Sequence, residues 1–468
     1  MNGVGPGARV RARVGIGVIV YLHLTVARGA GAADRTLPVP WPTTPAQVIP
    51  PPPASTSTSR PTDTTATKDT TATTTTTATT TTTTSAASPG ESRTELGAIG
   101  EGVVFIDRDH DADWDLRRLM GALMHRPADW LRFRAELGIE HADTFAAQQV
   151  VVELSPTRAF GLRAGLMLLP LGIINQLNAP PTYLTVDRPL TDQLIIPTIW
   201  RELGAGIFGD LAGALRYELD VVSGLDASAF AAQAPLAGGR GNGARIGITG
   251  AAMTGRIELH DSGGFAMGGS GYYGSASGGQ ATLDGVKVGI VEGDVRYRGG
   301  GVDLRAEVAE VFILDSYLIN DYLGLLGQDA IPKTGRGAYV QAGYDVLRLG
   351  DADTKQELLF FAGFENVNPR SSMSPYNFNP ATITPVGETA PNAPSPPRSF
   401  VRGGIVYRPL PELAFKADLQ VALDGEGPPS TVPVTRSGAP GTPTPLEPHL
   451  AEAARGKTRL GFGLGFAF

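Results

Sequence analysis

The stretch "LRFRAELGIE", residues 131–140, alternates between two kinds of side chain. Its odd positions, from Leu131 to Ile139, are apolar, and most of its even positions are charged. The charged members are Arg132, Arg134, Glu136 and Glu140. A period of two residues is typical of a strand with one apolar and one polar face. Because about ten residues is also the length of a tilted membrane strand, the apolar face is expected to contact lipid and the polar face to line a water-filled interior.

The same pattern recurs along the chain, for example in "ALRYELDVV" (214–222), "GVDLRAEV" (301–308) and "LAFKADLQV" (413–421). Counting such pieces predicts sixteen strands, which begin near residues 97, 115, 129, 147, 160, 200, 212, 246, 264, 286, 301, 336, 356, 398, 411 and 457. Every second connection is a short turn, and the others are mostly longer. This asymmetry is typical of an antiparallel outer-membrane β-barrel, whereas a soluble β-sandwich predicts charge-poor inner faces and no such asymmetry.

Composition excludes several other classes of protein. The 468 residues include no cysteine, so there is neither a disulfide framework nor a thiolate site. The net charge of −7 gives no electrostatic support for a nucleic-acid partner. The sequence lacks the G-x-S-x-G, H-E-x-x-H and G-x-x-x-x-G-K-[ST] motifs, and its six histidines are scattered. We therefore expect no enzyme activity, no cofactor and no metal site.

The first 95 residues differ from the rest of the chain. Three arginines precede an apolar stretch at 14–26, and an Ala30-x-Ala32 pattern follows, so residues 1–32 are predicted to be a signal peptide. The alternative is a disordered N-terminus in a cytoplasmic protein. Residues 33–95 are rich in proline and threonine and are predicted to form a disordered periplasmic segment, because they cannot bury enough apolar surface to fold. Residues 96–468 are then the outer-membrane β-barrel.

A longer block indicates a family. Residues 166–209 contain "P-x-G-x-x-N", "PPT", "R-P" and "IIPT-x-WRE-x-G", and they resemble the phosphate-selective porin O/P-like family of Gram-negative outer-membrane porins. The resemblance implies a homotrimer in the lipid of the outer membrane. The terminal "LGFGLGFAF" is similar to the Phe-ending strand that the barrel assembly machinery reads, which makes Phe468 the expected contact with that machinery.

The connection at 171–199 is expected to fold into the barrel. In the sixteen-stranded porins that this chain resembles, the third long loop narrows the channel. The residues agree, because "IINQL" and "LIIPTIW" are too apolar for a loop in solvent and four prolines stiffen the connection. The charged residues expected to set the field at the constriction are Asp187, Arg188, Asp192, Arg201 and Glu202. The alternative is that some of them only anchor the loop to the wall as ion pairs.

The polar faces of the strands supply the expected pore lining. Its members are Arg132, Arg134, Glu136, Glu140, Arg163, Arg216, Glu218, Asp220, Arg256, Glu258, Asp294, Arg296, Asp303, Arg305, Glu307, Lys416 and Asp418. Arginines alternate with carboxylates here, and residues 96–468 hold 31 Lys and Arg against 41 Asp and Glu. Since a paired guanidinium offers little to a passing oxyanion, we expect a weakly selective channel that leans towards cations.

The predicted function is therefore an outer-membrane porin that lets small hydrophilic solutes and ions diffuse passively. The alternative is a non-conducting structural or surface barrel protein. A separate acidic stretch, "DRDHDADWD" at 107–115, has aspartates at alternate positions, as in some calcium sites. It lacks the glycine and distal glutamate of a calcium loop, so a solvated acidic loop is the favoured interpretation.

Overall fold

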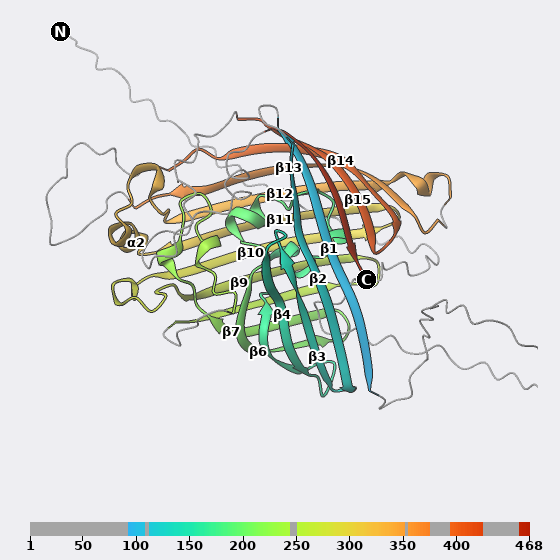
Figure 1. Ribbon diagram of the computed structural model, residues 1–468, viewed down its shortest axis with the longest axis horizontal. Helices are drawn as coiled ribbons and strands as arrows, with labels where there is room; N and C mark the ends of the chain where they lie inside the picture. Colours follow the sequence, from blue (N-terminus) through green and yellow to red (C-terminus); the bar gives the residue numbers. More distant parts are fainter. Residues whose placement is uncertain (1–91, 108–111, 244–249, 352–353, 375–393, 425–457) are drawn as a thin grey trace, which may run out of the picture. The chain divides into compact units, whose positions relative to one another are not determined.

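The computed structural model describes residues 92–107, 112–243, 250–351, 354–374, 394–424 and 458–468. The predicted signal peptide and nearly all of the proline- and threonine-rich segment lie outside these ranges. The described residues form a closed antiparallel β-barrel in which each strand pairs with its neighbours in sequence and β16 pairs with β1 (Figure 1). The predicted sixteen-stranded barrel is therefore confirmed.

The strands are β1 (Arg93–Asp107), β2 (Asp113–Ala128), β3 (Leu131–Glu140), β4 (Thr144–Leu154), β5 (Gly161–Leu168), β6 (Arg201–Leu211), β7 (Leu215–Ser223), β8 (Ala251–His260), β9 (Phe265–Ser275), β10 (Lys287–Gly299), β11 (Val302–Leu314), β12 (Thr334–Asp345), β13 (Glu357–Ser372), β14 (Arg398–Leu410), β15 (Leu413–Ala422) and β16 (Arg459–Ala467). Each strand begins within five residues of its predicted start. The first begins early, so residues 93–95 belong to the barrel and not to the predicted disordered segment.

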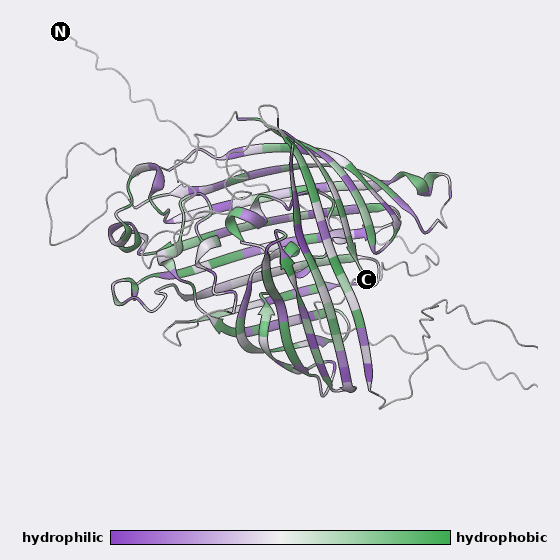
Figure 2. Ribbon diagram, in the orientation of Figure 1, coloured by the Kyte–Doolittle hydropathy of each residue, from purple (hydrophilic) through white to green (hydrophobic). Residues whose placement is uncertain are grey.

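Alternation along the strands sorts side chains between the two faces of the barrel wall. In β3, Phe133 is 40% exposed on the outside, whereas Glu136 is 2% exposed on the inside. Apolar and polar residues alternate in the same way along the other strands (Figure 2). Exposed aromatic side chains lie near both ends of the outer surface, with Phe160, Tyr297 and Phe468 at one end and Trp114 and Phe145 at the other. Such rings mark the two interfaces of a membrane.

The barrel closes between its first and last strands. Ile99 pairs with Ala467, and the backbones of Ala98 and Phe468 exchange two hydrogen bonds of 2.7 and 3.0 Å. The rings of Phe466 and Phe468 stack with their centroids 5.0 Å apart. The Phe466 ring also covers Gly100 on β1, where a Cβ atom would overlap it. A glycine at position 100 therefore lets the ring lie flat across the closing pair.

The two ends of the barrel differ in their connections. At the short-turn end, the connections between β2 and β3, between β4 and β5 and so on are brief. At the long-loop end, the first two connections, 108–112 and 141–143, are also short, and the third is the first long one. It spans residues 169–200, here called the inward loop, and contains α1 (Gly172–Gln176), η1 (Pro180–Thr182) and η2 (Thr191–Ile195).

The other helical segments are η3 (Ala227–Ala229), η4 (Ala237–Gly239), η5 (Ala281–Leu283), α2 (Ser316–Leu323), η6 (Gly327–Asp329) and η7 (Val346–Leu349). None of the helices in the described part of the chain is long and apolar enough to cross a membrane.

The largest apolar cluster joins the inner face of the wall to the connections at its long-loop end. It joins the inward loop, through Leu190 and Trp200, to Phe230 in the β7–β8 connection and to Ile319 in α2. All four side chains are at most 1% exposed. The apolar sequence of the inward loop thus has a structural cause, because neighbouring connections and the barrel wall cover it.

Candidate functional site

The inward loop crosses the lumen, the interior of the barrel. Its η1 segment contacts β15, β16 and β1, whereas η2 contacts β11, β12 and β13. Almost all of its residues are buried. The predicted inward-folded loop is therefore confirmed, and it touches two separate parts of the wall.

Asn175 closes the base of the inward loop. Its side-chain amide donates to the carbonyl oxygens of Leu169, at 2.6 Å, and of Trp200, at 3.1 Å. Its side-chain oxygen accepts a hydrogen bond of 2.8 Å from the Trp200 backbone N–H. One buried amide thus joins the residues where the loop leaves β5 and enters β6. Asn175 was not among the predicted site residues, although it is the asparagine of the "P-x-G-x-x-N" pattern.

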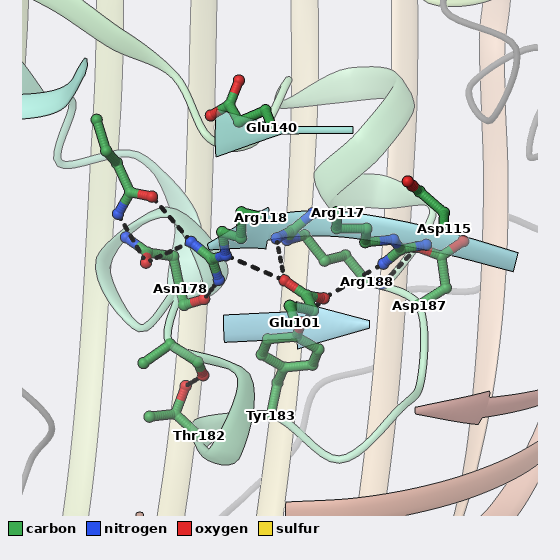
Figure 3. A network of polar contacts seen from close by, with 12 residues as sticks. Glu101, Asp115, Arg117, Arg118, Glu140, Asn178, Thr182, Tyr183, Asp187 and Arg188 are labelled. Carbon is green, nitrogen blue, oxygen red and sulfur yellow. Dashed lines mark hydrogen bonds and ion pairs between the residues drawn. The ribbon is translucent and has the colours of Figure 1, made fainter. Parts of the chain in front are cut away.

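Glu101 on β1 is the centre of a buried network that holds the first half of the loop (Figure 3). Its carboxylate pairs with Arg117 at 3.4 Å and with Arg118 at 3.1 Å, both on β2. From the loop, Arg188 pairs with it at 3.1 Å, and the Tyr183 hydroxyl donates to it. Because one carboxylate receives donors from both the wall and the loop, it fixes their relative position.

Arg118 extends this network to the start of the loop. Its guanidinium donates to the Gln148 side chain on β4 at 2.9 Å and to the side chain of Asn178 on the loop at 3.2 Å. It also donates to the Asn178 carbonyl oxygen. Gln148 in turn donates to Glu136 at 2.9 Å. The wall from β1 to β4 therefore binds the loop through neutral amides as well as ion pairs.

Asp187 is a second anchor of the loop. Arg117 pairs with its carboxylate at 2.8 Å, and Arg459 on β16 pairs with the other oxygen. Arg402 on β14 donates to its carbonyl oxygen at 2.9 Å. Burial alone would raise the pKa of Asp187, but Arg117, Arg459 and Arg402 outweigh this effect and hold the pKa well below its ordinary value. Asp187 and Arg188 thus form ion pairs that attach the loop to the wall, as the alternative in the sequence analysis expected.

Asp192, five residues further along, has a contrasting environment. Its side chain is fully buried, neither carboxylate oxygen accepts a hydrogen bond of good geometry within the described residues, and the Tyr339 hydroxyl on β12 is the donor that faces it. Burial raises its pKa well above the ordinary value, and the nearby carboxylates Glu307, Glu292 and Glu365 raise it further. Of the predicted loop charges, Asp192 faces an acidic part of the wall instead of an arginine.

Arg201 and Glu202 do not lie on the loop, and this part of the prediction is wrong. They are the first two residues of β6. Arg201 pairs with Glu140 on β3 at 3.1 Å. Glu202 accepts hydrogen bonds from the Trp200 indole at 3.0 Å, from the Gly241 backbone at 2.8 Å and from Ser223. The chain re-enters the wall directly after Trp200, so these two residues act at the wall and not at the loop.

Every predicted pore-lining residue lies on the interior side of its strand, buried or half-buried. Most form close ion pairs with neighbours on the wall. Representative pairs are Arg163–Glu218 (2.7 Å), Arg163–Asp220 (2.6 Å), Arg256–Glu258 (2.9 Å), Arg256–Asp294 (2.6 Å) and Arg305–Asp303 (2.8 Å). Two others bind the inward loop, since Lys416 donates to the Thr185 carbonyl oxygen at 3.1 Å and Asp418 accepts from the Val186 N–H at 2.7 Å.

Several residues of the network escaped the sequence analysis. A β-bulge between β1 and β2 leaves Arg117 without a Cα partner on β1, and both Arg117 and Arg118 are buried inside the barrel. A strict period of two would turn one of them towards lipid, so alternation alone could not find the pair. Glu101 was missed because it is the one charge in the run of glycines and apolar residues at 96–106.

The acidic stretch at 107–115 is only partly visible. Asp107 ends β1 and Asp113 begins β2, while residues 108–111 lie outside the described ranges. Within the described residues, no group of three or more His, Cys, Asp or Glu side chains is placed to hold a metal ion.

A closed antiparallel barrel with an apolar outside and a charged inside is the architecture of outer-membrane proteins of Gram-negative bacteria. This chain is an integral outer-membrane β-barrel protein whose exterior contacts lipid. An uncharacterized protein of Aquifex aeolicus (strain VF5) is 32% identical to it over 330 residues, which cover 67% of this chain and 71% of the relative. The chain belongs to the same family as that protein. No protein-family model matches the chain.

Among solved structures, the chain is similar to outer-membrane-expressed OmpT of Vibrio cholerae, with a TM-score of 0.47 and 11% identity over 82% of this chain and 99% of that one. An anion-selective porin from Comamonas acidovorans gives a TM-score of 0.46 with 13% identity, over 81% and 100% of the two chains. The outer-membrane channel DcaP of Acinetobacter baumannii gives 0.45 with 10% identity, over 81% and 99%.

Proposed function

We propose that the protein is a porin, through which small hydrophilic solutes and ions diffuse passively across the outer membrane without catalysis or a cofactor. The observation that carries this proposal is the charged lumen. Carboxylates and guanidiniums cover the inner face of the wall, and a structured loop crosses the space between them. A polar interior is what a water-filled path for hydrated solutes requires.

The pairing of the lumenal charges supports weak selectivity that leans towards cations. Most arginines of the predicted pore lining already bind carboxylates, as Arg163 and Arg256 do, so they offer few free donors to a passing oxyanion. The resemblance to phosphate-selective porins remains a prediction, and the paired arginines do not favour a phosphate trap.

Planar-bilayer recording tests this function. The refolded full-length protein should give discrete conductance steps, and a KCl gradient should give a small reversal potential of the sign for cation preference. Phosphate added at millimolar concentration should leave the conductance unchanged. Protein kept unfolded and added in the same detergent is the control. Strong anion preference together with block by submillimolar phosphate would contradict the proposed selectivity.

One observation favours the alternative of a non-conducting barrel. The inward loop joins a continuous apolar cluster with the β7–β8 connection and α2 at the long-loop end of the barrel. Such a cluster narrows the space left for solutes. A correctly folded barrel that never conducts in the bilayer would reject the porin and support a structural or surface role.

Two assembly proposals accompany the function. We propose a homotrimer, as the porin resemblance implies, and chemical crosslinking in mild detergent should give a ladder that ends at three copies. Only monomers over a range of protein concentrations would reject it.

Recognition of the strand that ends at Phe468 by the barrel assembly machinery also remains a prediction, to be checked by comparing the outer-membrane yield of Phe468→Leu and Phe468→Ala.

A further inference from the structure

The inward loop meets an acidic part of the wall at η2. Among the carboxyl groups there, Asp192, Glu307 on β11 and Glu292 on β10 carry oxygen atoms without a hydrogen-bond partner within the described residues: both oxygens of Asp192 and Oε1 of each glutamate. The three side chains are at most 7% exposed. We call these residues the acidic latch. Burying a polar atom without a hydrogen-bond partner costs free energy. Because several acceptor oxygens are buried here together, the site requires hydrogen-bond donors.

Two of these oxygens, one from Asp192 and one from Glu307, lie beside Gly172 on the loop. A Cβ atom at Gly172 would lie 2.8 Å from Glu307 Oε1 and 3.2 Å from Asp192 Oδ1. Both unpartnered oxygens therefore border the space that a side chain at this position would fill. Gly172 also has φ of +68°, which favours glycine. The backbone thus allows two carboxyl groups from different elements to approach each other.

The donors around the latch are already bound to other atoms. On β12, the Tyr339 hydroxyl faces Asp192 but donates to Glu307 Oε2 at 3.1 Å, and the Ile173 N–H donates to the same oxygen at 2.9 Å. On β9, the Ser270 hydroxyl donates to Glu292 Oε2.

The charged neighbours do not neutralise Asp192 either. Arg256 on β8 pairs with Asp294 at 2.6 Å and reaches Glu292 at 3.4 Å, and Arg305 on β11 pairs with Asp303. On β13, Glu365 adds another negative group and accepts a hydrogen bond from the Leu190 N–H. No ion pair to Asp192 exists among the described residues. Buried carboxylates this close to one another cannot all be ionised, because each charge disfavours the next.

We propose that Asp192 and Glu307 hold the inward loop against β11 and β12 through shared protons, so that the loop detaches from this wall when the acidic latch ionises. A protonated carboxyl group is a donor, and it supplies the hydrogen bond that the unpartnered oxygens lack. Burial and the neighbouring carboxylates raise the pKa of Asp192, so the docked loop binds protons more tightly than the detached loop. Docking is therefore complete below the ordinary aspartate pKa and weakens as the pH rises towards the raised value.

Thiol labelling tests the latch without relying on conduction. The chain contains no cysteine, so a single cysteine can report on η2. Thr191 is fully buried, and its hydroxyl has no hydrogen-bond partner in the described residues, which makes Thr191→Cys a mild change. Thr144→Cys, at an exposed position, corrects for the ionisation of the thiol itself. The ratio of the two maleimide reaction rates should rise between pH 6 and pH 9, by up to tenfold per pH unit for each proton released.

The matched variant is Asp192→Asn, which keeps the shape and one donor of the protonated acid but cannot ionise. In the Thr191→Cys background it should keep the labelling ratio low and constant from pH 6 to pH 9. Glu307→Gln gives a second test if Asp192→Asn does not fold. A flat ratio in the protein with Asp192 intact, or an equal rise in the Asn and Gln variants, would overturn the proposal.

A reversible crosslink connects the latch to conduction, and this step rests on the proposed porin function. A Cβ at Gly337 on β12 would lie 2.7 Å from Thr191 Oγ1, so Thr191→Cys/Gly337→Cys should form a disulfide between loop and wall. Single-channel current should become noisier with rising pH in the reduced form and remain steady in the oxidised form. Equal pH-dependent noise in both forms would overturn the latch, whereas a complete lack of current would reject the porin and leave the labelling result to decide the latch.

Discussion

At the scale of single residues, Asp187 and Asp192 show that position on the sequence does not fix the role of a charge. Both are aspartates of the same loop, and both are buried. Asp187 lies among Arg117, Arg402 and Arg459, whereas Asp192 faces carboxylates. The sequence placed both on the loop, but the partners come from strands far away in the chain. Their opposite environments could not be derived from local spacing.

Removing the Asp187 carboxylate should weaken the attachment of the first half of the inward loop to the wall. Asp187→Ala leaves Arg117 and Arg459 buried without their common partner, and breaking such a buried ion pair costs about 3 to 5 kcal/mol. The measurement is denaturant unfolding of the barrel in detergent. Glu95→Ala is the control, because its partner Arg93 is largely exposed and the loss should be under about 1 kcal/mol. Equal losses in the two variants would contradict the anchoring role.

The same anchor should respond to acid and not to alkali. The pKa of Asp187 is depressed, so its contribution is present above the ordinary carboxylate pKa of about 4 and is lost as the pH falls towards the depressed value. The difference in unfolding free energy between the wild type and Asp187→Asn should therefore be constant from pH 9 to pH 5 and shrink below about pH 4. If the difference in unfolding free energy shrank with rising pH instead, the pKa of Asp187 would be raised and not lowered, and the prediction would be wrong.

At the scale of elements, the strands followed from the two-residue period, but one local departure did not. The bulge at Arg117 breaks the period, so that the neighbouring residues Arg117 and Arg118 are both buried inside the barrel. A bulge depends on the register between two neighbouring strands. Register is a property of a pair of strands, so the pattern of one strand alone cannot reveal it.

Pairing of β4 with β5 should depend on Gly165. It has φ of +135°, and a Cβ there would overlap the carbonyl oxygen of Val150 on β4. Gly165→Ala should therefore lower the yield of folded barrel in refolding assays, detected as loss of the heat-modifiable band on a gel. Gly102→Ala on β1 is the matched control, since the nearest atom to its Cβ would be 4.0 Å away. Similar yields for the two variants would count against a close β4–β5 contact.

At the scale of the whole molecule, alternation predicted that the outer face of the barrel is apolar. The border of this apolar outer face at the long-loop end emerged only from the register of β11 and β12. Glu310 and Arg336 both lie on the outer face and are directly opposite each other. Below this pair the outer face is apolar, with Val308 57% and Val340 51% exposed. The lumenal network, which joins β1, β2, β14 and β16 to one loop, could not be foreseen, because it requires the closed barrel.

An arginine scan of β11 should locate the membrane. Val308 lies near the middle of the strand and Leu314 at its long-loop end, and both face outward. Val308→Arg should destabilise the barrel in lipid vesicles by about 2 to 4 kcal/mol, and Leu314→Arg by about 0 to 1 kcal/mol, because the penalty falls with distance from the bilayer midplane. Denaturant titration in vesicles measures both. Equal penalties at the two positions would show that the apolar outer face does not match the bilayer.

The inward loop also has a mechanical consequence. It is attached to β1 and β2 through Glu101 and Asp187 and packs through η2 on β11, β12 and β13. Because the loop connects separate parts of the wall, it should resist flattening of the cross-section of the barrel. Lateral tension in the bilayer should then change the width of the barrel very little. In Asp187→Ala, where the loop is less firmly attached, osmotic stretching of the vesicle should deform the barrel more easily.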